Sequence, residues 1–355
     1  MSATPPESTG APWLLYGAYG FTGELIARHS VERGHAPVLA GRDSERTRSL
    51  ARDLGLSTRI FSLDDPVGSR EGVRGMAAVL NAAGPFSRTW RPMTAACFAE
   101  GCHYLDVTGE IDVLEGIQAR DDEVRSAGLH FVPAVGFDVV PTDCAAALAA
   151  RSMENPAELD LAFHVSGGPS KGTARTAVER MGSASAVRRG GRIVPIPVGS
   201  VRRNIPFSDR DRRGTAIPWG DVSTAYRSTG VPDIRVFAIL PDRMVRLARI
   251  AGALMKLPLA RNLAGWAVDA MVSGPDEDEL ARGYSRVWAE ARNLAGASST
   301  VELLTPNGYV LTARAAVAAI ERVLAGRVEQ GPGVHTPSRA FGADFVLGLE
   351  GVTRV

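Results

Sequence analysis

A chain of 355 residues that is 45% hydrophobic and 22% charged is long enough for two domains with separate cores. Its formal net charge of +1 gives no support to a nucleic-acid-binding protein steered by overall charge. The three cysteines, Cys97, Cys102 and Cys144, are odd in number and lack a nearby cluster of histidines, which argues against a disulfide framework and against a zinc site. We therefore expect no metal.

Residues 1–12 are polar and proline-rich and lack the basic start of a secretory signal, so we expect a disordered leader on a cytoplasmic protein. The following run at 12–17 is apolar and leads into the motif GAYGFTG, with glycines at 17, 20 and 23 before a helical pattern. These features predict a strand, a tight turn and a helix start. Such a turn directs backbone N–H groups and the helix dipole at a phosphate, and it indicates a dinucleotide site.

Strand-like and helix-like patterns alternate through residues 1–145. Repeated βα units of this kind predict an α/β fold, namely a Rossmann doubly wound parallel sheet with its ligand at the carboxyl ends of the strands. The predicted strands lie in the runs 12–17, 36–42, 58–63, 77–84, 103–109 and 130–138. We expect residues 1–145 to form the dinucleotide-binding domain.

The pattern changes after a predicted helix at 141–153. Strands are indicated at 158–167, 191–207, 233–240, 284–293 and 299–309, the last two as antiparallel partners, and helices at 172–186 and 311–326. Because few crossover helices join these strands, we expect a second, α+β domain at 146–326, built on a mixed or antiparallel sheet. We expect the tail at 327–355 to pack back on the first domain.

The apolar residues 244–272 are interrupted by basic residues and by Pro258. They are consistent with a pair of helices that cover the sheet, and also with an apolar lid or interfacial element for a hydrophobic substrate or a membrane surface. No run of about eighteen uncharged apolar residues predicts a membrane span. We do not predict peripheral membrane binding, and the sequence leaves the oligomeric state open.

A second notable segment, residues 188–213, is rich in arginine. Its arginines are Arg188, Arg189, Arg192, Arg202, Arg203, Arg210, Arg212 and Arg213. They could grip a substrate with several carboxylates, dock an acidic acyl carrier protein, or be solvated charges that protect an edge strand. The segment lacks interleaved aromatic residues apart from Phe207 and Trp219, so we expect no nucleic-acid partner.

The second predicted strand ends in Gly41 and Arg42, where NAD-binding folds usually place an acid for the ribose hydroxyls. A guanidinium there can pair with a 2′-phosphate, so the sequence favours NADP(H) over NAD(H); the alternative is a solvated loop charge. Lysine occurs only at Lys171 and Lys256, each preceded four residues earlier by glycine. The Tyr-x-x-x-Lys pair that short-chain reductases use as proton donor is therefore absent.

Five motifs in order, GAYGFTG, LAGRD, VLNAAGPFSR, FAEGCHYLDVTGE and GFDVVPTD, resemble the NADP-binding domain of the saccharopine dehydrogenase-like family, which includes trans-acting enoyl reductases of lipid and polyketide pathways. The later SKGTARTA, IPWGDVSTAYRSTGVPDIRVF and GVHTPSRAFG are similar to the second domain of that branch. In GFDVVPTD, Val139 and Val140 replace the proline and glycine of Gly-x-Asp-Pro-Gly in saccharopine reductases. This departure weakens the case for an amino-acid substrate.

The resemblance implies three groups of cofactor-binding residues. The pyrophosphate would be held by Gly17, Tyr19, Gly20, Phe21, Thr22 and Gly23. The adenosine half would meet Arg42 and Ser44 at the 2′-phosphate and Asp64 near adenine. The nicotinamide ribose would be approached closely by Asn81, Ala83, Gly84 and Pro85, where small residues suit a close approach of the backbone.

Hydride transfer to a polarised double bond also needs a proton donor and a group that stabilises the negative charge that develops. The catalytic candidates are Tyr104, Asp106 and Asp143, at the carboxyl ends of the fifth and sixth predicted strands. Tyr104 and Asp106 alternate onto one face, and a carboxyl group in a dry cleft can act as an acid. The alternative interpretation is that Asp106, Glu110 and Asp138 cap loops and helix starts.

The sequence thus predicts an NADPH-dependent oxidoreductase that reduces an activated C=C bond of an enoyl-type lipid or polyketide intermediate. Its partners would be a small, hydrophobic substrate and an acyl carrier protein. The alternatives are a C=N or C=O reductase that works by saccharopine-like reductive condensation, and a NADP-binding scaffold without turnover.

Overall fold

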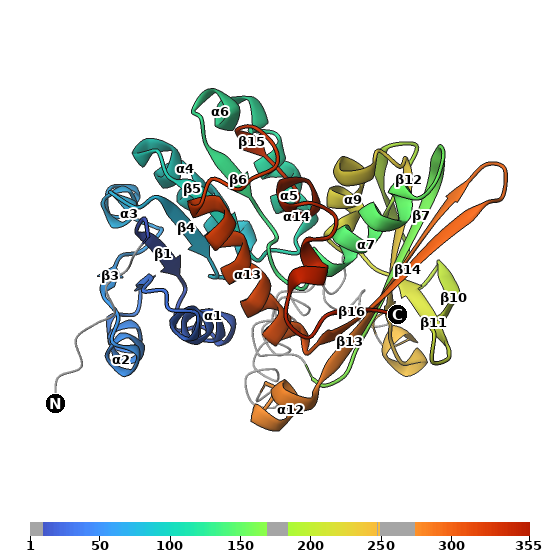
Figure 1. Cartoon of the computed structure of the whole chain (residues 1–355), viewed down its shortest axis with the longest axis horizontal. Helices are drawn as coiled ribbons and strands as arrows, with labels where there is room; N and C mark the ends of the chain where they lie inside the picture. The colour runs from blue at the N-terminus through green and yellow to red at the C-terminus, as the bar shows by residue number, and fades with distance from the viewer. Residues whose placement is uncertain (1–9, 169–183, 247, 249–273) are drawn as a thin grey trace. The chain divides into compact units, whose positions relative to one another are not determined.

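The computed structural model describes residues 10–168, 184–246, 248 and 274–355 (Figure 1). The chain divides into unit 1, residues 1–140 with 309–350, and unit 2, residues 141–308 with 351–355. Most of the helix expected at 172–186 and most of the apolar segment at 244–272 lie outside the described residues. Ser185 and Ala186, at the end of that expected helix, instead begin a strand.

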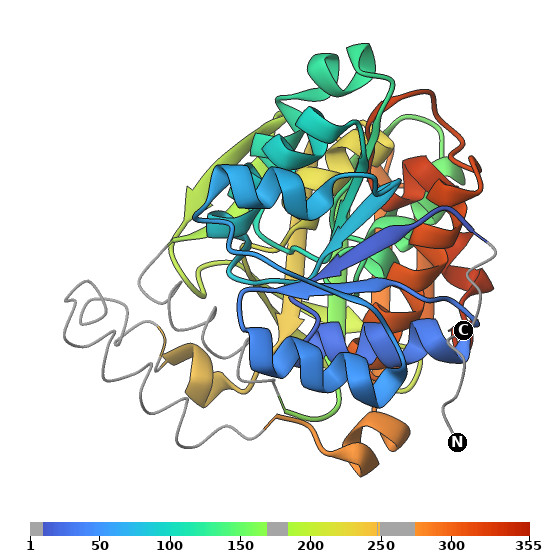
Figure 2. The same ribbon diagram turned by 90° about the vertical axis from the view of Figure 1, so that its left-hand side faces the viewer.

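Unit 1 is built on a seven-stranded sheet in which all neighbouring strands are parallel (Figures 1 and 2). In spatial order the strands are β15 (Gly333–Val334), β6 (His130–Val132), β5 (His103–Asp106), β4 (Ala78–Asn81), β1 (Trp13–Tyr16), β2 (Val38–Gly41) and β3 (Thr58–Ile60). The strand order reverses at β1 and β4, the switch point where doubly wound sheets bind ligands. The predicted Rossmann-type fold is confirmed, including all six strands expected from the sequence.

Helices cover both faces of this sheet (Figure 2). They are α1 (Phe21–Glu32), α2 (Ser44–Leu54), α3 (Pro66–Val73), α4 (Phe86–Glu100), α5 (Ile111–Gln118), α6 (Asp121–Ser126), α13 (Gly308–Leu324), α14 (Pro337–Phe341) and the 3-10 turn η1 (Phe345–Gly348). Sequence explains several boundaries: the Asp43 side chain caps α2 and the Asp65 side chain caps α3, each accepting a backbone N–H of the first turn. Gly55 and Gly101, in the left-handed conformation, end α2 and α4.

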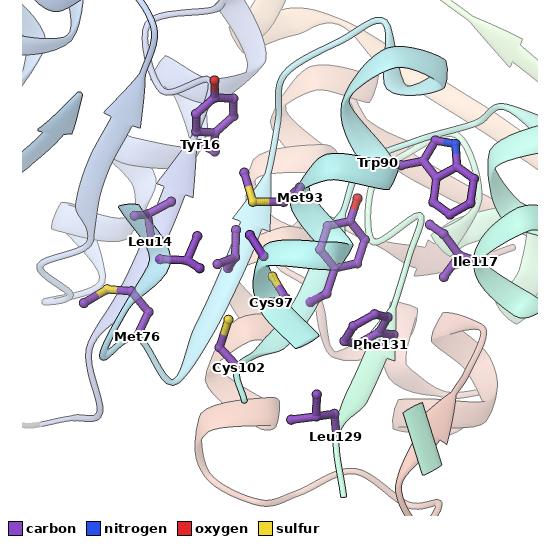
Figure 3. Close-up of a cluster of buried hydrophobic side chains, with 14 of the residues drawn as sticks. Leu14, Tyr16, Met76, Trp90, Met93, Cys97, Cys102, Ile117, Leu129 and Phe131 are labelled. Carbon is purple, nitrogen blue, oxygen red and sulfur yellow. The ribbon is translucent and has the colours of Figure 1, made fainter. Parts of the chain in front are cut away.

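The core of unit 1 lies where the sheet meets α4 and α5 (Figure 3). Leu14 and Phe131 come from strands, Met93 and Cys97 from α4, and Ile117 from α5, and all five side chains are buried. Burying each large apolar side chain contributes about 1.5–3 kcal/mol to folding. Burial also raises the pKa of the Cys97 thiol, which keeps it protonated and unreactive.

Unit 2 is a mixed sheet with α7 (Val140–Arg151), α9 (Asp221–Thr229) and α12 (Glu277–Arg282). Its strands are β10 (Arg202–Pro206), β11 (Asp211–Ala216), β12 (Asp233–Ile239), β7 (Pro156–Val165), β13 (Tyr284–Asn293), β14 (Ser298–Pro306) and β16 (Thr353–Arg354), with β8 (Ser185–Arg189) and β9 (Arg192–Ile196) paired beside β12. Among the strand pairs in the described part of unit 2, β12 and β7 are parallel and the others are antiparallel. The expected α+β class with a mixed sheet is confirmed.

Three elements differ from those expected from the sequence. The run at 191–207 forms two strands, because prolines such as Pro197 cannot donate to a ladder. Helix α13 starts at Gly308 and its residues from Tyr309 onward belong to unit 1, although we expected the helix in the second domain. In the tail, β15 extends the unit 1 sheet, whereas β16 pairs with β14 of unit 2. Among the described residues, no helix is long and apolar enough to cross a membrane.

Three of the six histidines lie close together: His103 and His130 begin β5 and β6, and His335 directly follows β15. The ring centroids of His103 and His130 lie 5.4 Å apart, and those of His130 and His335 lie 6.3 Å apart. The His103 ring accepts the backbone N–H of His130 at 3.0 Å, and the His335 Nε2 contacts the Gly331 carbonyl at 2.7 Å. Burial lowers the pKa of all three imidazoles, and His130 is lowered further by its two neighbours.

We expect these histidines to make unit 1 less stable in acid. Their pKa values are lower in the folded chain than the ordinary 6.5, so the unfolded chain binds protons first as the pH falls below about 6.5. Replacing His130, whose Nδ1 is buried without a hydrogen-bond partner in the described residues, by Phe should flatten the fall in the free energy of unfolding between pH 7.5 and 5.5. Urea unfolding across that range measures the slope, with His29→Gln as the control. An unchanged slope would contradict the assignment.

Candidate functional site

The glycine turn between β1 and α1 is packed so tightly that side chains cannot enter it. Gly17 has φ +80°, and a Cβ there would lie 2.7 Å from the backbone N of Ala83, at the end of β4. A Cβ on Gly23 would lie 2.2 Å from the Gly17 carbonyl oxygen. The turn therefore brings the backbone of α1 directly over the switch point.

The start of α1 presents free donors to this edge of the sheet. Gly17 donates its N–H to Ala40, and Gly20 donates to Gly17. No acceptor exists among the described residues for the N–H groups of Phe21, Thr22 and Gly23, and Gly20, the N-cap, offers no side chain. Unpaired N–H groups at the positive end of a helix fit a pyrophosphate, so the glycine turn is suited to the group that the sequence predicts.

The adenosine end of the site lies beyond β2. Arg42 follows this strand, its side chain is exposed, and within the described part of the chain it makes no hydrogen bond or ion pair. The Arg46 guanidinium stacks on the Tyr19 ring, with its Cζ 4.6 Å from the ring centroid, and donates to the Tyr19 carbonyl at 3.1 Å. Ser44 is the first residue of α2. Two guanidinium groups thus lie near the expected position of a 2′-phosphate.

Asp64 follows β3, the outermost strand on this side, and its side chain is exposed. Its carboxylate accepts the Ser62 hydroxyl at 3.1 Å. Asp64 therefore lies on the side of the sheet where we expect adenine. A contact between Asp64 and adenine remains a prediction.

On the other side of β1, the residues that follow β4 are fixed by a buried amide. The Asn81 Oδ1 accepts the Ala83 N–H at 3.1 Å, and the Thr89 hydroxyl donates to the Ala83 carbonyl at 2.8 Å. The peptide bond between Gly84 and Pro85 is cis, and Pro85 is the N-cap of α4. The backbone of this turn lies beside the glycine turn, with Ala83 next to Gly17. This is where we expect the nicotinamide ribose to bind.

Tyr104 and Asp106 share one face of β5, as predicted, but both side chains are fully buried. The Tyr104 hydroxyl donates to Asp106 at 2.7 Å, and the same carboxylate accepts the N–H groups of Thr108 at 3.0 Å and Ala134 at 2.8 Å. Burial raises the pKa of Asp106 to about 6 and that of Tyr104 well above its ordinary value. Because the Tyr104 hydroxyl donates to Asp106 and its pKa is raised, this geometry supports a positioning role for the pair and argues against direct proton delivery from Tyr104.

The capping interpretation also accounts for Glu110, whose carboxylate accepts the Phe86 N–H at the start of α4 at 2.9 Å. Asp138 packs against Gly109, where a Cβ would lie 2.5 Å from its carboxylate oxygen. Glu110, in the loop after β5, therefore caps the start of α4. Asp138, after β6, packs against the loop after β5.

Asp143 belongs to unit 2, in the first turn of α7, and is fully buried. It accepts the Ser228 hydroxyl at 2.5 Å. Asp221 is equally buried and accepts the Thr142 hydroxyl at 2.7 Å; burial and the charge of Asp143 raise the pKa of Asp221 well above its ordinary value. Burial and the nearby charge of Asp143 therefore favour the protonated form of the Asp221 carboxyl group.

Sequence reasoning missed two threonines that hold the cofactor edge. Thr89 stands just beyond the quoted motif VLNAAGPFSR and could have been found from it. Thr312, in α13, accepts the Phe137 N–H at 3.0 Å, and a contact across 175 residues leaves no local signal.

We expect Arg42→Ala to weaken binding of NADPH and to leave binding of NADH unchanged. A hydrogen bond to a charged group contributes about 1.5–3 kcal/mol, so the dissociation constant for NADPH should rise about tenfold or more. Fluorescence titration of the two nucleotides measures the difference, and Arg52→Ala, an exposed change elsewhere on α2, is the control. Equal losses for both nucleotides would exclude a 2′-phosphate contact.

One solved structure agrees with the architecture described above. The apo saccharopine dehydrogenase (L-Glu forming) of Saccharomyces cerevisiae superposes with a TM-score of 0.61, covering 98% of this chain and 100% of that one, at 11% identity. This likeness concerns the fold alone. It extends over both units.

Curated relatives match a shorter stretch. A trans-acting enoyl reductase of Mycobacterium leprae is 36% identical over 146 residues, 39% of this chain and 35% of its own length. A trans-acting enoyl reductase of Mycobacterium tuberculosis (strain ATCC 25618 / H37Rv) is 33% identical over 138 residues, 37% of this chain and 33% of its own length. The matched stretch thus spans about a third of these relatives.

The family described as "Saccharopine dehydrogenase NADP binding domain" matches residues 13–132. The match begins at β1 and ends with β6, so it covers the glycine turn, Arg42, the turn after β4 and the buried Asp106. Residues 13–132 are therefore similar to the NADP-binding domain of saccharopine dehydrogenases.

Proposed function

We propose that this protein is an NADPH-dependent oxidoreductase that reduces an activated C=C bond of an enoyl thioester. The observation that carries the proposal is the NADP-binding domain itself, whose curated relatives are trans-acting enoyl reductases. NADPH, when bound, supplies a hydride. The β-carbon of the substrate accepts the hydride, the thioester oxygen takes up the negative charge, and the α-carbon receives a proton.

The residues of unit 1 orient the cofactor in this proposal. The glycine turn holds the pyrophosphate and Arg42 holds the 2′-phosphate. Asn81 fixes the turn after β4, and Asp106 keeps the ends of β5 and β6 in place beneath it. None of these groups has to gain or lose a proton during the reaction.

Asp143 is our candidate proton donor, and we propose unit 2 as the substrate domain. The support is the burial of Asp143 and Asp221 in unit 2, where burial and the charge of Asp143 raise the pKa of Asp221 well above its ordinary value, so that this acidic site retains a proton at a pH where isolated carboxyl groups have lost it. The hydroxyls of Ser228 and Thr142 orient the two carboxyl groups. Water would replace the donated proton after each turnover.

The structure weakens the case for an arginine clamp on a polyacid, because half of the arginines in the 188–213 segment have structural partners. Arg188 is buried and donates to the Val222 and Gly191 carbonyls, and Arg203 pairs with Asp160 and Glu290. Arg202 and Arg212 are also paired, with Asp242 and Asp209. The exposed remainder is Arg189, Arg192, Arg210 and Arg213.

Those four exposed arginines suit a protein partner better than a small polyacid. An acidic acyl carrier protein that delivers the enoyl group as a thioester is the partner we propose, in line with the word trans-acting in the names of the relatives. Contact between exposed charges of opposite sign weakens in salt, with a Debye length of about 8 Å at physiological ionic strength.

The function is tested by loss of NADPH absorbance with two substrates in parallel, a medium-chain enoyl thioester and an aldehyde with glutamate. We expect turnover of the thioester, faster when it is carried on an acyl carrier protein than on coenzyme A, and slower in high salt. Turnover of the aldehyde with glutamate alone would replace the proposal by a C=N reductase. Tight NADPH binding without turnover of either would favour a scaffold.

We expect Asp143→Asn to lower kcat at least tenfold and to leave the dissociation constant for NADPH within a factor of two, because the cofactor residues belong to unit 1. In the unchanged protein, kcat should fall as the pH rises through the pKa of the buried pair. The variant should lose that limb of the pH profile. Asp211→Asn, an exposed acid of unit 2, is the control. A variant with the normal kcat and profile would exclude Asp143 as the donor.

A further inference from the structure

The return of the chain to unit 1 places helix α13 beside α1 in a defined direction. At one end, the rings of Phe21 and Tyr309 meet edge to face, with centroids 5.0 Å apart and planes at 86°. At the other end, Glu321 accepts Arg33 at 3.1 Å and contacts His35 Nε2 at 2.7 Å. Phe21 begins α1 and Tyr309 lies at the start of α13, so these contacts join the start of α13 to the start of α1, and the later part of α13 to the residues that follow α1. Tyr309 therefore lies at the cofactor edge of the sheet.

A second set of contacts fixes the side of the site on which Tyr309 lies. Thr312, one turn further along α13, accepts the Phe137 N–H after β6. A Cβ on Gly136 would lie 3.0 Å from the Thr312 methyl carbon and 3.2 Å from Val107, which follows β5. The start of α13 is thus held between α1 and the ends of β5 and β6. Arg42 lies on the opposite side of β1, after β2, so α13 borders the nicotinamide half of the site.

The aromatic pair is only partly enclosed. The Phe21 side chain is 37% exposed although it stands at the first position of the dinucleotide helix, and Tyr309 is half-buried. Phe21 also carries one of the three backbone N–H groups that face the pyrophosphate position. The Tyr309 ring contacts the Phe21 ring. We therefore expect Tyr309 to lie close to the ribose that is attached to the bound pyrophosphate.

We propose that Tyr309 and Phe21 form an aromatic wall that positions the nicotinamide riboside of NADP. Two apolar ring surfaces at this place limit how far the nicotinamide end can swing, while the phosphates are held by the glycine turn. Tyr309 is thus a cofactor-positioning residue supplied by the far end of the chain. The inference concerns the cofactor and stands whichever substrate is reduced.

The test compares two ligands, NADPH and 2′,5′-ADP, which lacks the nicotinamide riboside and the phosphate attached to it. For Tyr309→Leu, which keeps apolar packing at the start of α13, we expect the dissociation constant for NADPH to rise about tenfold and that for 2′,5′-ADP to stay within a factor of two. Tyr309→Phe, which keeps the ring, should bind both ligands within a factor of three of the unchanged protein. Isothermal titration calorimetry with the full chain measures both constants.

Glu321→Gln is the matched control, because it weakens the contact between α13 and α1 at the end away from the cofactor. We expect it to lower the thermal midpoint without separating the two ligands. If Tyr309→Leu weakens both ligands equally, Tyr309 acts only through the packing of α13 and the proposal is wrong. Unchanged NADPH binding in Tyr309→Leu would also overturn it. Neither outcome depends on turnover, so a failed enoyl assay leaves the test intact.

Discussion

The cofactor edge of unit 1 depends on one buried carboxylate, that of Asp106. It accepts two backbone N–H groups and the Tyr104 hydroxyl, and through Tyr104 it connects to Asn81 at the end of β4. One of its donors, Ala134, has φ +63°, a conformation that side chains other than glycine rarely adopt. Each buried N–H left unpaired costs about 1–3 kcal/mol, so this carboxylate holds the turns after β5 and β6 in conformations that they would otherwise leave.

The two candidate acids of the chain differ in what surrounds them. Asp106 has three donors aimed at its oxygens, which favours the ionised form against the effect of burial, and its pKa rises only to about 6. The Asp143 and Asp221 pair of unit 2 has hydroxyl partners and a second carboxyl group, and each charge opposes the other. The groups around a buried carboxyl group thus distinguish one that stabilises the fold in its ionised form from one that retains a proton.

The sequence was enough to predict the sheet of unit 1 and the tight glycine turn between β1 and α1, because the spacing of Gly17, Gly20 and Gly23 and the short apolar runs are local signals. It also predicted that Tyr104 and Asp106 share a face. Whether that face is open or buried depends on α4 and α5, which pack over it, and no local pattern reports this. No local pattern could predict that α13 packs in unit 1 either, since the contacts of Tyr309, Thr312 and Glu321 span 175 to 288 residues.

The composite nature of unit 1 has a consequence for the order in which the chain folds. Residues 309–350 are synthesised after residues 141–308 of unit 2, and until then β6 lacks its neighbour β15 and α1 lacks α13. Contacts between such distant segments form late, because closing long loops costs entropy before it is repaid. Unit 1, which begins first, therefore cannot be completed until most of unit 2 has been synthesised. NADP that binds only the completed domain will shift the folding equilibrium toward chains in which residues 309–350 have docked on the rest of unit 1. Bound cofactor therefore stabilises the completely folded domain over partly folded forms.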